Sequence, residues 1–227
     1  MRPSRACTAL LATVLLASVA YAETITVDFT AKSARLRLNG GAVLSHDGTG
    51  FVTPTVTWDN GLYAGVSSMW AERRKSDETD FNAGLKRPCF WFVCRLDVSY
   101  WALPNFTNVK GDALDVTGEV SDSYDIGNGE SVGWLLHADH LTFFGQSSLE
   151  VYRAMGNWTP TLLGQTLRLS AGIAYRTDKE RWHVPLTMGV PFVLSEHWSA
   201  TPGIEAYYTL DKHQFEKAVM LTFSWKR

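Results

Sequence analysis

Beyond its first 22 residues the sequence has no long apolar run, and this absence excludes a helical membrane protein. Charged residues make up only 19% of the chain, and no linker, low-complexity tract or internal repeat divides it. A single domain from residue 23 to residue 227 is therefore the simplest organisation. The chain also lacks a glycine-rich phosphate loop, a Cys-x-x-Cys pair and an acidic calcium loop, so we expect no cofactor.

The first residues have the three parts of a secretory signal peptide. Arg2 and Arg5 precede an apolar run from Ala9 to Val19, and Ala20-Tyr21-Ala22 is a small-x-small cleavage site. We expect cleavage after Ala22 and a mature chain that begins at Glu23. Without its two arginines the 21 basic residues of the chain fall to 19 against 23 acidic ones, which argues against a nucleic-acid partner.

Alternation of apolar and polar residues is the main structural signal, because successive side chains of a β-strand point to opposite faces. It is clearest in the C-terminal part of the chain. From Thr166 to Arg176 the odd positions are apolar and the even positions are polar or small. Three further segments also have one apolar and one polar face: Trp182–Leu194, Trp198–Tyr208 and Gln214–Trp225.

Alternating segments also occur upstream. They are Leu36–Leu44, Val52–Trp58, Arg95–Tyr100 and Leu114–Ser121, with weaker ones at Leu62–Trp70, Thr79–Lys86, Ser131–Phe143 and Ser148–Met155. The total is about 12 strands, within a range of about 10 to 14, and an even number is expected for a membrane barrel. Two segments find no place in this scheme: Ile25–Phe29, which is short, and Gly156–Gly164, which interrupts the alternation.

The faces and ends of these segments favour a membrane barrel over a soluble sandwich or lipocalin-like barrel. Aromatic residues lie on the apolar face near strand ends, as in the girdles of transmembrane barrels: Trp58, Trp70, Trp101, Trp182, Phe192, Trp198, Tyr208, Phe223 and Trp225. The other face carries charged residues that a soluble core would scarcely accept unpaired. The sequence therefore predicts an all-β protein, an antiparallel transmembrane β-barrel with its apolar face outward.

The signal peptide, the amphipathic strands and the closing sequence AVMLTFSWKR resemble Gram-negative outer-membrane β-barrel proteins of the porin-like type. The resemblance covers the mature chain as a pattern and identifies no subfamily. It implies location in the cell outer membrane, contact with outer-membrane lipid, and insertion by the barrel assembly machinery, with Phe223 and Trp225 as the assembly signal. Lys226 and Arg227 depart from the usual terminal aromatic residue.

The connections give the barrel an expected orientation. With the N-terminus in the periplasm, the tight turn at Asp59-Asn60-Gly61 lies on the periplasmic side. Longer polar segments such as Glu72–Glu78 and Leu103–Gly111 then lie outside the cell, as is usual for such barrels.

Cys89 and Cys94 enclose the sequence Phe-Trp-Phe-Val and allow two arrangements. In one continuous strand their side chains point to opposite faces and cannot bond. In a hairpin that turns at Trp91-Phe92 they are directly opposed and can form a disulfide, which we favour because the periplasm is oxidising. Two thiols without a nearby histidine pair do not predict a metal site.

Charged residues of both signs fall on the predicted inner face: Arg35, Arg37, Lys86, Arg95, Asp97, Asp115, Glu119, His137, Asp139, Arg168, Arg176, Glu205 and Glu216. A charged lumen favours a small passive pore for ions or small hydrophilic solutes. The same charges would also pair in a narrow or plugged barrel with a structural or adhesive role. About 12 strands lie between filled eight-stranded barrels and open porins, so both hypotheses stay open.

A lipid-modifying enzyme is the third hypothesis. Outer-membrane lipid hydrolases carry a Ser-His pair on the outer wall, and the candidate here is the segment His137-Ala138-Asp139-His140. A nucleophilic site needs a hydroxyl within hydrogen-bond reach of its base. No His-x-Ser pair occurs in this segment, and Ser147 and Ser148 follow only after a loop. We therefore expect no catalytic residues and assign His137 to the lumen.

Overall fold

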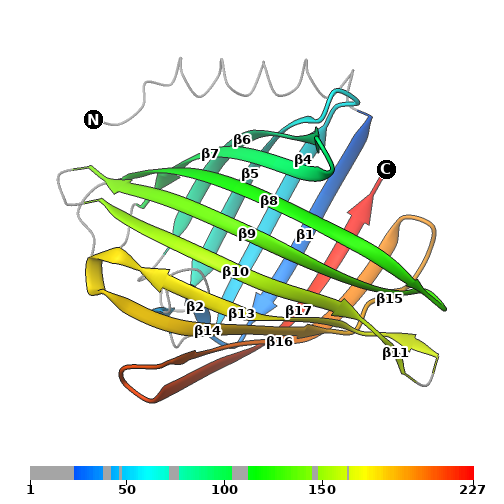
Figure 1. Cartoon of the computed structure of the whole chain (residues 1–227). Coiled ribbons are helices and arrows are strands. Elements are labelled where there is room, and N and C mark those ends of the chain that lie inside the picture. Colours follow the sequence, from blue (N-terminus) through cyan, green and yellow to red (C-terminus); the bar gives the residue numbers. More distant parts are fainter. Residues whose placement is uncertain are drawn as a thin grey trace, which may run out of the picture.

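The computed structural model describes residues 23–37, 42–45, 48–71, 77–103, 112–144, 148–162 and 164–227. The predicted signal peptide, residues 1–22, lies outside this part of the chain. Figure 1 shows the described strands as a curved antiparallel sheet that closes on itself. Among the described residues, no helix has the length and apolar character needed to cross a membrane.

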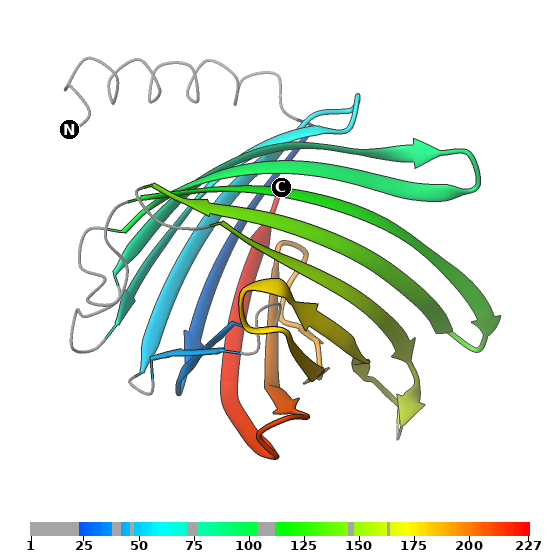
Figure 2. The same ribbon diagram turned by 60° about the vertical axis from the view of Figure 1, so that its left-hand side comes forward.

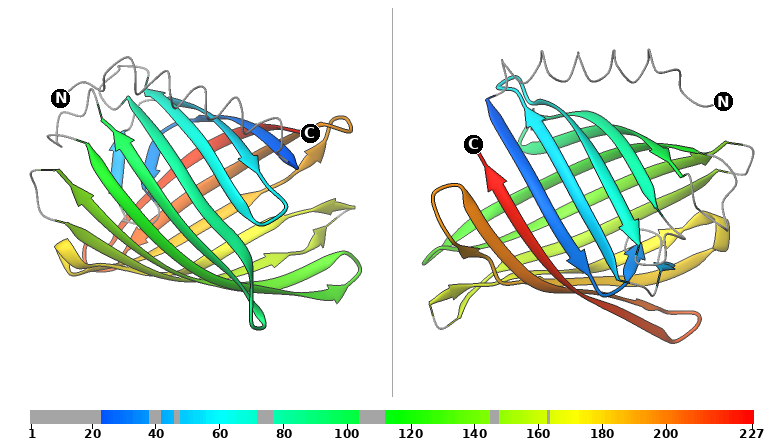
Figure 3. Two further views of the ribbon diagram at one scale, coloured as in Figure 1. Left: turned by 90° about the horizontal axis from the view of Figure 1, so that it is seen from above. Right: turned by 180° about the vertical axis from the view of Figure 1, so that it is seen from behind.

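Twelve strands form the wall of the barrel. They are β1 (Thr24–Lys32), β4 (Thr49–Thr57), β5 (Leu62–Ala71), β6 (Glu78–Cys89), β7 (Phe92–Ala102), β8 (Ala113–Gly127), β9 (Glu130–Phe143), β10 (Leu149–Thr159), β13 (Arg168–Arg176), β14 (Arg181–Gly189), β16 (Trp198–Thr209) and β17 (Gln214–Lys226). Neighbours in this order pair antiparallel, and β17 also pairs with β1, which closes the ring (Figure 3). A closed ring has no free edge, so its backbone polar groups bond within the wall, as lipid requires. The predicted fold class and strand number are confirmed.

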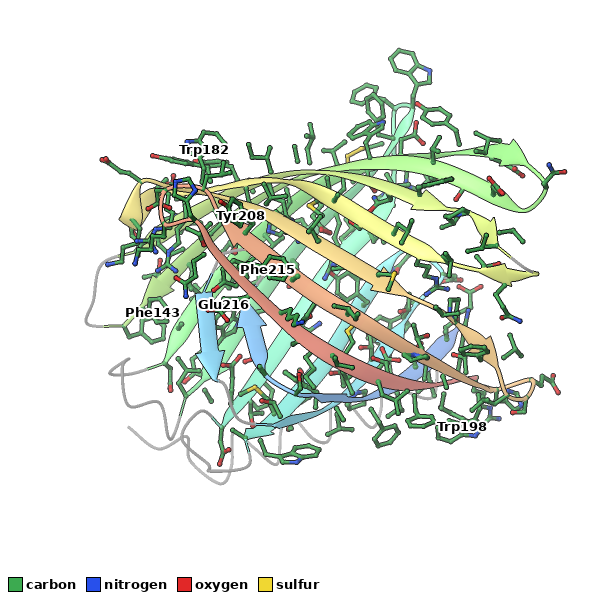
Figure 4. The ribbon with its side chains drawn as sticks, turned by 90° about the horizontal axis from the view of Figure 1, so that it is seen from below. Phe143, Trp182, Trp198, Tyr208, Phe215 and Glu216 are labelled. Atoms are coloured by element: carbon green, nitrogen blue, oxygen red, sulfur yellow. A yellow bond between two sulfur atoms is a disulfide. The ribbon has the colours of Figure 1, made fainter. Side chains whose placement is uncertain are left out.

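Exposed apolar residues alternate with less accessible polar residues along the wall strands. On β7, Leu96 and Val98 are 57% and 43% exposed, whereas Asp97 between them is 5% exposed. Phe215 and Glu216, neighbours on β17, likewise leave opposite faces of the wall (Figure 4). The apolar face is therefore the outer one and the polar face lines the lumen.

The two ends of the barrel differ in their connections. The first, which we call the turn end, has the two-residue turns after β6 and β8 and both termini of the described barrel. Tight reversals there use left-handed backbone at Gly61 and Asn128, with φ of 84° and 57°. Figure 2 shows the β8–β9 hairpin extending far at this end. The opposite end, which we call the loop end, has the connections after β1, β5, β7, β9, β13 and β16.

Two N-terminal segments differ from the prediction. Ile25–Phe29, which had no predicted place, belongs to wall strand β1. Leu36–Leu44 is not the predicted wall strand, because β2 (Arg35–Arg37) and β3 (Ala42–Ser45) form a separate hairpin beside β17. The sequence Asn39-Gly40-Gly41 explains the error, since it is a turn signal inside the alternation.

Two later segments also differ. The interruption at Gly156–Gly164 begins later than predicted, because β10 continues to Thr159. A small hairpin follows at the turn end, formed by β11 (Thr161–Leu162) and β12 (Gln165–Thr166). The predicted strand Trp182–Leu194 ends at Gly189, and β15 (Phe192–Val193) pairs with β16 as an extra strand. A 3-10 turn, η2 (Thr177–Lys179), joins β13 to β14 at the loop end.

Candidate pore lining

The structure places most of the predicted lumenal residues on inward positions of their strands. These are Lys86, Arg95, Asp97, Asp115, Glu119, His137, Asp139, Arg168, Arg176, Glu205 and Glu216. The side chains of Arg35 and Arg37 lie outside the described part of the structure.

A connected group of side chains crosses the inner wall from β5 to β10, and we call it the waist network: Tyr63, Arg95, Asp97, Glu119, His137 and Arg153. Its centre is the Arg95 guanidinium, whose Nε donates to the Tyr63 hydroxyl at 2.6 Å. The other guanidinium nitrogens lie 3.3 Å from Asp97 and 3.3 Å from Glu119. The Tyr63 hydroxyl donates to Asp97, which also accepts from Ser99 at 2.9 Å. Arg95 therefore compensates two carboxylates on neighbouring strands.

Gly84 allows Tyr63 to reach this network. In the register of the wall, Gly84 on β6 lies between Tyr63 on β5 and Asp97 on β7. A Cβ atom at Gly84 would overlap the Tyr63 ring and hydroxyl and the carbonyl oxygen of Leu96. The absence of a side chain therefore lets the tyrosine cross β6 and bond to the next strand.

His137 continues the waist network on β9. Its Nδ1 lies 3.4 Å from a Glu119 oxygen and 3.4 Å from an Arg153 nitrogen. Glu119 therefore lies between Arg95 and His137, and Arg153 extends the network onto β10. Arg153 was not among the predicted lumenal residues, because it lies on β10, whose alternation is weak in the sequence.

A second ion pair joins β1 to β16. Lys32 Nζ lies 2.7 Å from Glu205 Oε2 and 5.3 Å from the centre of the Phe51 ring. The pair reaches across β17, which lies between those two strands in the ring. Two more pairs lie at the loop end, Arg176 with Asp178 and Arg181 with Asp211. The lumen thus holds charges of both signs in close pairs.

Cations and carboxylates differ in how far they reach into the lumen. Among the described residues no inward lysine or arginine is buried. Five inward carboxylates are buried: Glu78, Asp97, Asp115, Asp139 and Glu205. In the waist network 38% of the Arg95 side chain is exposed, against 7% of Asp97 and 12% of Glu119. Lys86 and Arg168, near the turn end, are exposed. In the waist network a solute therefore meets the arginine before the two carboxylates.

Towards the turn end the inner wall is rich in hydroxyl groups. A cavity of about 300 Å³ there is lined in part by Ser121, Ser123, Ser131, Asn157 and Thr159, together with Lys86. The hydroxyls pair across strands, as between Ser131 and Thr159 at 2.7 Å. Such a wall can exchange hydrogen bonds with water or with a polar solute.

Towards the loop end the inner wall is apolar on one side, which the sequence did not predict. Leu103, Ala113, Leu141, Leu149 and Val151 form a buried cluster against which Trp101 and Phe143 pack. Ala34, Tyr207 and Ala218 form a second cluster on the opposite side of the ring. Apolar side chains therefore line part of the lumen at this end.

Cys89 and Cys94 are joined by a disulfide, with their Cα atoms 5.7 Å apart. The hairpin turns at Phe90-Trp91 and not at the predicted Trp91-Phe92, because Cys89 pairs with Phe92. The predicted direct opposition of the cysteines is therefore wrong, and they are diagonal neighbours on the outer face. Phe90 and Trp91 are 95% and 86% exposed at the turn.

The proposed assembly residues lie on the outer face of the closing strand. Phe223 is exposed opposite Phe29 of β1, and Trp225 lies 6.5 Å from the His197 ring. Their role in assembly stays a prediction. For the described residues, no group of three or more histidine, cysteine, aspartate or glutamate side chains could hold a metal ion.

No protein-family model matches the sequence, and no curated protein matches it. Several solved structures have the same fold. The COG4313 outer membrane channel from Pseudomonas putida F1 has a TM-score of 0.62 at 11% identity, covering 91% of this chain and 96% of that chain. The NanC porin has a TM-score of 0.57 at 14% identity, and the KdgM porin 0.56 at 11%; each covers 88% of this chain and 98% of its own. At these identities the likeness shows the fold alone.

Proposed function

We propose that the chain is an outer-membrane protein whose barrel is a passive pore for ions and small hydrophilic solutes. The observation that carries this proposal is the inner wall, which is polar and charged inside a ring with an apolar outer face. Such a wall keeps water in the lumen and offers partners to a hydrated solute. The predicted signal peptide and the porin-like fold support the outer membrane as the location, with the turn end in the periplasm and the loop end outside.

The pore we propose is narrow. The waist network occupies one side of the lumen, and apolar clusters line part of the loop end. At the turn end the hydroxyl-lined cavity has a volume of about 300 Å³. We therefore expect single ions and small solutes to pass and larger solutes to be excluded.

The pore we propose prefers anions. In the Lys32–Glu205 pair and in the waist network the carboxylates are more buried than their cations, and Lys86 and Arg168 near the turn end are exposed. A charge that projects into the lumen acts on a passing ion at shorter range than one held at the wall. The exposed cations, and not the acidic composition of the chain, should therefore set the preference.

Planar-bilayer recording of the refolded barrel tests both the pore and its preference for anions. We expect stable current steps, and under a KCl gradient a reversal potential that corresponds to faster passage of chloride. The double variant Lys86→Gln/Arg168→Gln should lower the chloride preference, whereas Arg87→Gln should not, because Arg87 lies one residue from Lys86 but on the outer face. Silence of a correctly folded barrel would contradict the pore. Conductance with a preference for potassium would contradict only the proposed anion preference.

A further inference from the structure

Four polar side chains meet on the outer face of the wall near the loop end. The Thr142 hydroxyl lies 3.2 Å from His140 Nε2. On the other side of the imidazole, His140 Nδ1 lies 3.6 Å from Glu150 Oε1. The second oxygen of Glu150 accepts a hydrogen bond from the Tyr152 hydroxyl at 2.7 Å. The order is hydroxyl, imidazole, carboxylate and a phenol that holds the carboxylate.

Strand geometry produces this arrangement. His140 and Thr142 are two residues apart on β9, so their side chains leave the same face. Glu150 on β10 is directly opposite His140 in the register, and the backbone N–H of Glu150 donates to Thr177 Oγ1 at 2.9 Å. Two paired strands and a bond from the next connection therefore hold the three groups, which makes the site a property of the wall.

The surroundings of these groups are unusual for ionisable residues. They face outward, where Val116 pairs with His140 and Leu114 with Thr142 on the neighbouring strand β8. Ionisable residues on the lipid side of a barrel are destabilising unless they have a function or lie at the membrane interface. In the proposed orientation the loop end lies in the outer leaflet, and the exposed aromatic residues Tyr152 and Trp182 nearby mark an interface. Acyl ester groups of lipids lie at that depth.

We propose that Thr142, His140 and Glu150 form a hydrolytic site for acyl esters of outer-leaflet lipids. The proposal goes beyond the pore and rests only on the proposed membrane orientation. A hydroxyl next to an imidazole that is oriented by a carboxylate is the arrangement that activates a nucleophile. His137, the histidine first considered for such a site, faces the lumen in the waist network, so His140 is the base.

The reaction has two balanced steps. The Thr142 oxygen attacks the ester carbonyl carbon while His140 Nε2 takes the hydroxyl proton. The tetrahedral intermediate expels the lipid alcohol, which receives that proton, and leaves an acyl group on Thr142. Water then attacks the acyl-threonine and gives a proton to His140. The bond between the acyl carbon and Thr142 Oγ1 breaks, His140 returns the proton to Oγ1, and the products are a free fatty acid and the original hydroxyl. Glu150 holds the imidazole and stabilises its protonated form, and Tyr152 positions Glu150.

The distances fit an unliganded site. The 3.2 Å contact is within hydrogen-bond reach, and the 3.6 Å contact between His140 and Glu150 is long for a hydrogen bond. Catalytic contacts are often long without substrate and shorten when it binds. Glu150 is 44% exposed at its side chain and His140 51%, so a lipid ester can approach both the base and the neighbouring hydroxyl.

The test uses the folded full-length mature barrel in phosphatidylcholine micelles and follows fatty-acid release. We expect release that falls at least roughly a hundredfold in Thr142→Ala and in His140→Ala, and roughly tenfold in Glu150→Gln. Thr142→Ser should retain activity, because serine keeps the hydroxyl in place. His213→Ala is the matched control, since His213 is also an exposed histidine at the loop end and also bonds to a side-chain hydroxyl, that of Tyr208.

A second measurement identifies the nucleophile directly. A fluorophosphonate should form a covalent adduct on the peptide that contains Thr142, and the adduct should be absent from His140→Ala. No fatty-acid release above that of empty micelles, or release that persists in Thr142→Ala, would overturn the site. Bilayer conductance should be the same in all these variants, because the site is on the outer wall. Failure of the hydrolytic site therefore leaves the pore proposal intact, and the reverse also holds.

Discussion

Replacing Lys32 by methionine should destabilise the barrel by about 3 kcal/mol, because it leaves a buried carboxylate without its cation. Lys32 Nζ lies 2.7 Å from Glu205 Oε2, and only 5% of the Glu205 side chain is exposed. Among the described residues, the other Glu205 oxygen, Oε1, has no hydrogen-bond partner. Lys32 is therefore the group that compensates this carboxylate.

The size of this destabilisation follows from the distance between Lys32 and Glu205 and from the burial of their side chains. Two unit charges 2.7 Å apart attract by about 6 kcal/mol at an effective dielectric constant of about 20. Removing both from water offsets much of this attraction, so the intact pair contributes little net stability. Loss of one partner is different and costs about 3–5 kcal/mol, since the desolvation of the remaining charge is no longer compensated. The Lys32 side chain is 18% exposed, so the pair is not fully removed from water. We therefore expect a loss at the lower end of this range.

The measurement is urea unfolding of the barrel in vesicles, followed by intrinsic fluorescence and heat-modifiable gel mobility. Lys32→Met should lose about 3 kcal/mol, and the double variant Lys32→Met/Glu205→Gln should recover to within about 1 kcal/mol of the native barrel, because no charge is then buried. Lys212→Met, in an exposed turn, should change stability by less than about 0.5 kcal/mol. A Lys32→Met barrel as stable as the native one would refute the reasoning, as would a double variant no better than the single one.

Three shorter predictions concern other parts of the wall. Gly84→Val should displace Tyr63 from the waist network and destabilise the barrel by about 1–3 kcal/mol in the same urea assay, because the new side chain overlaps the tyrosine. Replacing Cys89 and Cys94 by serine should cost no more than about 2 kcal/mol, since the disulfide closes a short loop in an already paired hairpin; a larger loss would show that the bond does more than restrict the unfolded chain. Trp225→Ala should reduce the folded fraction in cells while leaving refolding in detergent unchanged, and equal losses in both would argue for a structural role.

The alternation of the sequence predicted which residues face the lumen wherever the outer face is the more apolar one. On β7, β13 and β17 the two faces differ clearly, so the period of two assigned Arg95, Ala174 and Glu216 to the inside. On β10 the alternation does not separate the two faces, because the apolar residues Val151 and Met155 face inward beside Arg153. Where the inner wall carries its own apolar cluster, the inward residues of a strand are not all polar and the alternation is lost. The sequence therefore did not predict that Arg153 faces the lumen.

The arrangement on the outer wall could not be predicted from the sequence. His140 and Thr142 share a face at any register, so a search for a histidine followed by any hydroxyl two residues later would have found them. Glu150 is different, because its position opposite His140 depends on how β9 and β10 are aligned across their connection. A shift of one residue would place Glu150 on the inner face. The residue types of the site can be read from the sequence, but their proximity depends on the register of β9 and β10.

The same dependence on geometry explains why the formal charge of the chain is a poor guide to what its lumen would select. Aspartate is short, so a carboxylate such as Asp97 stays at the wall, where an arginine and a tyrosine bond to it. Arginine and lysine have long stems and carry their charge away from the wall that holds them. In a narrow lumen a few ångströms change the interaction with an ion substantially, because that interaction falls with distance and water screens whatever lies behind. A ring with more acidic than basic residues can therefore present a cationic inner surface, provided that its carboxylates are the partners held at the wall.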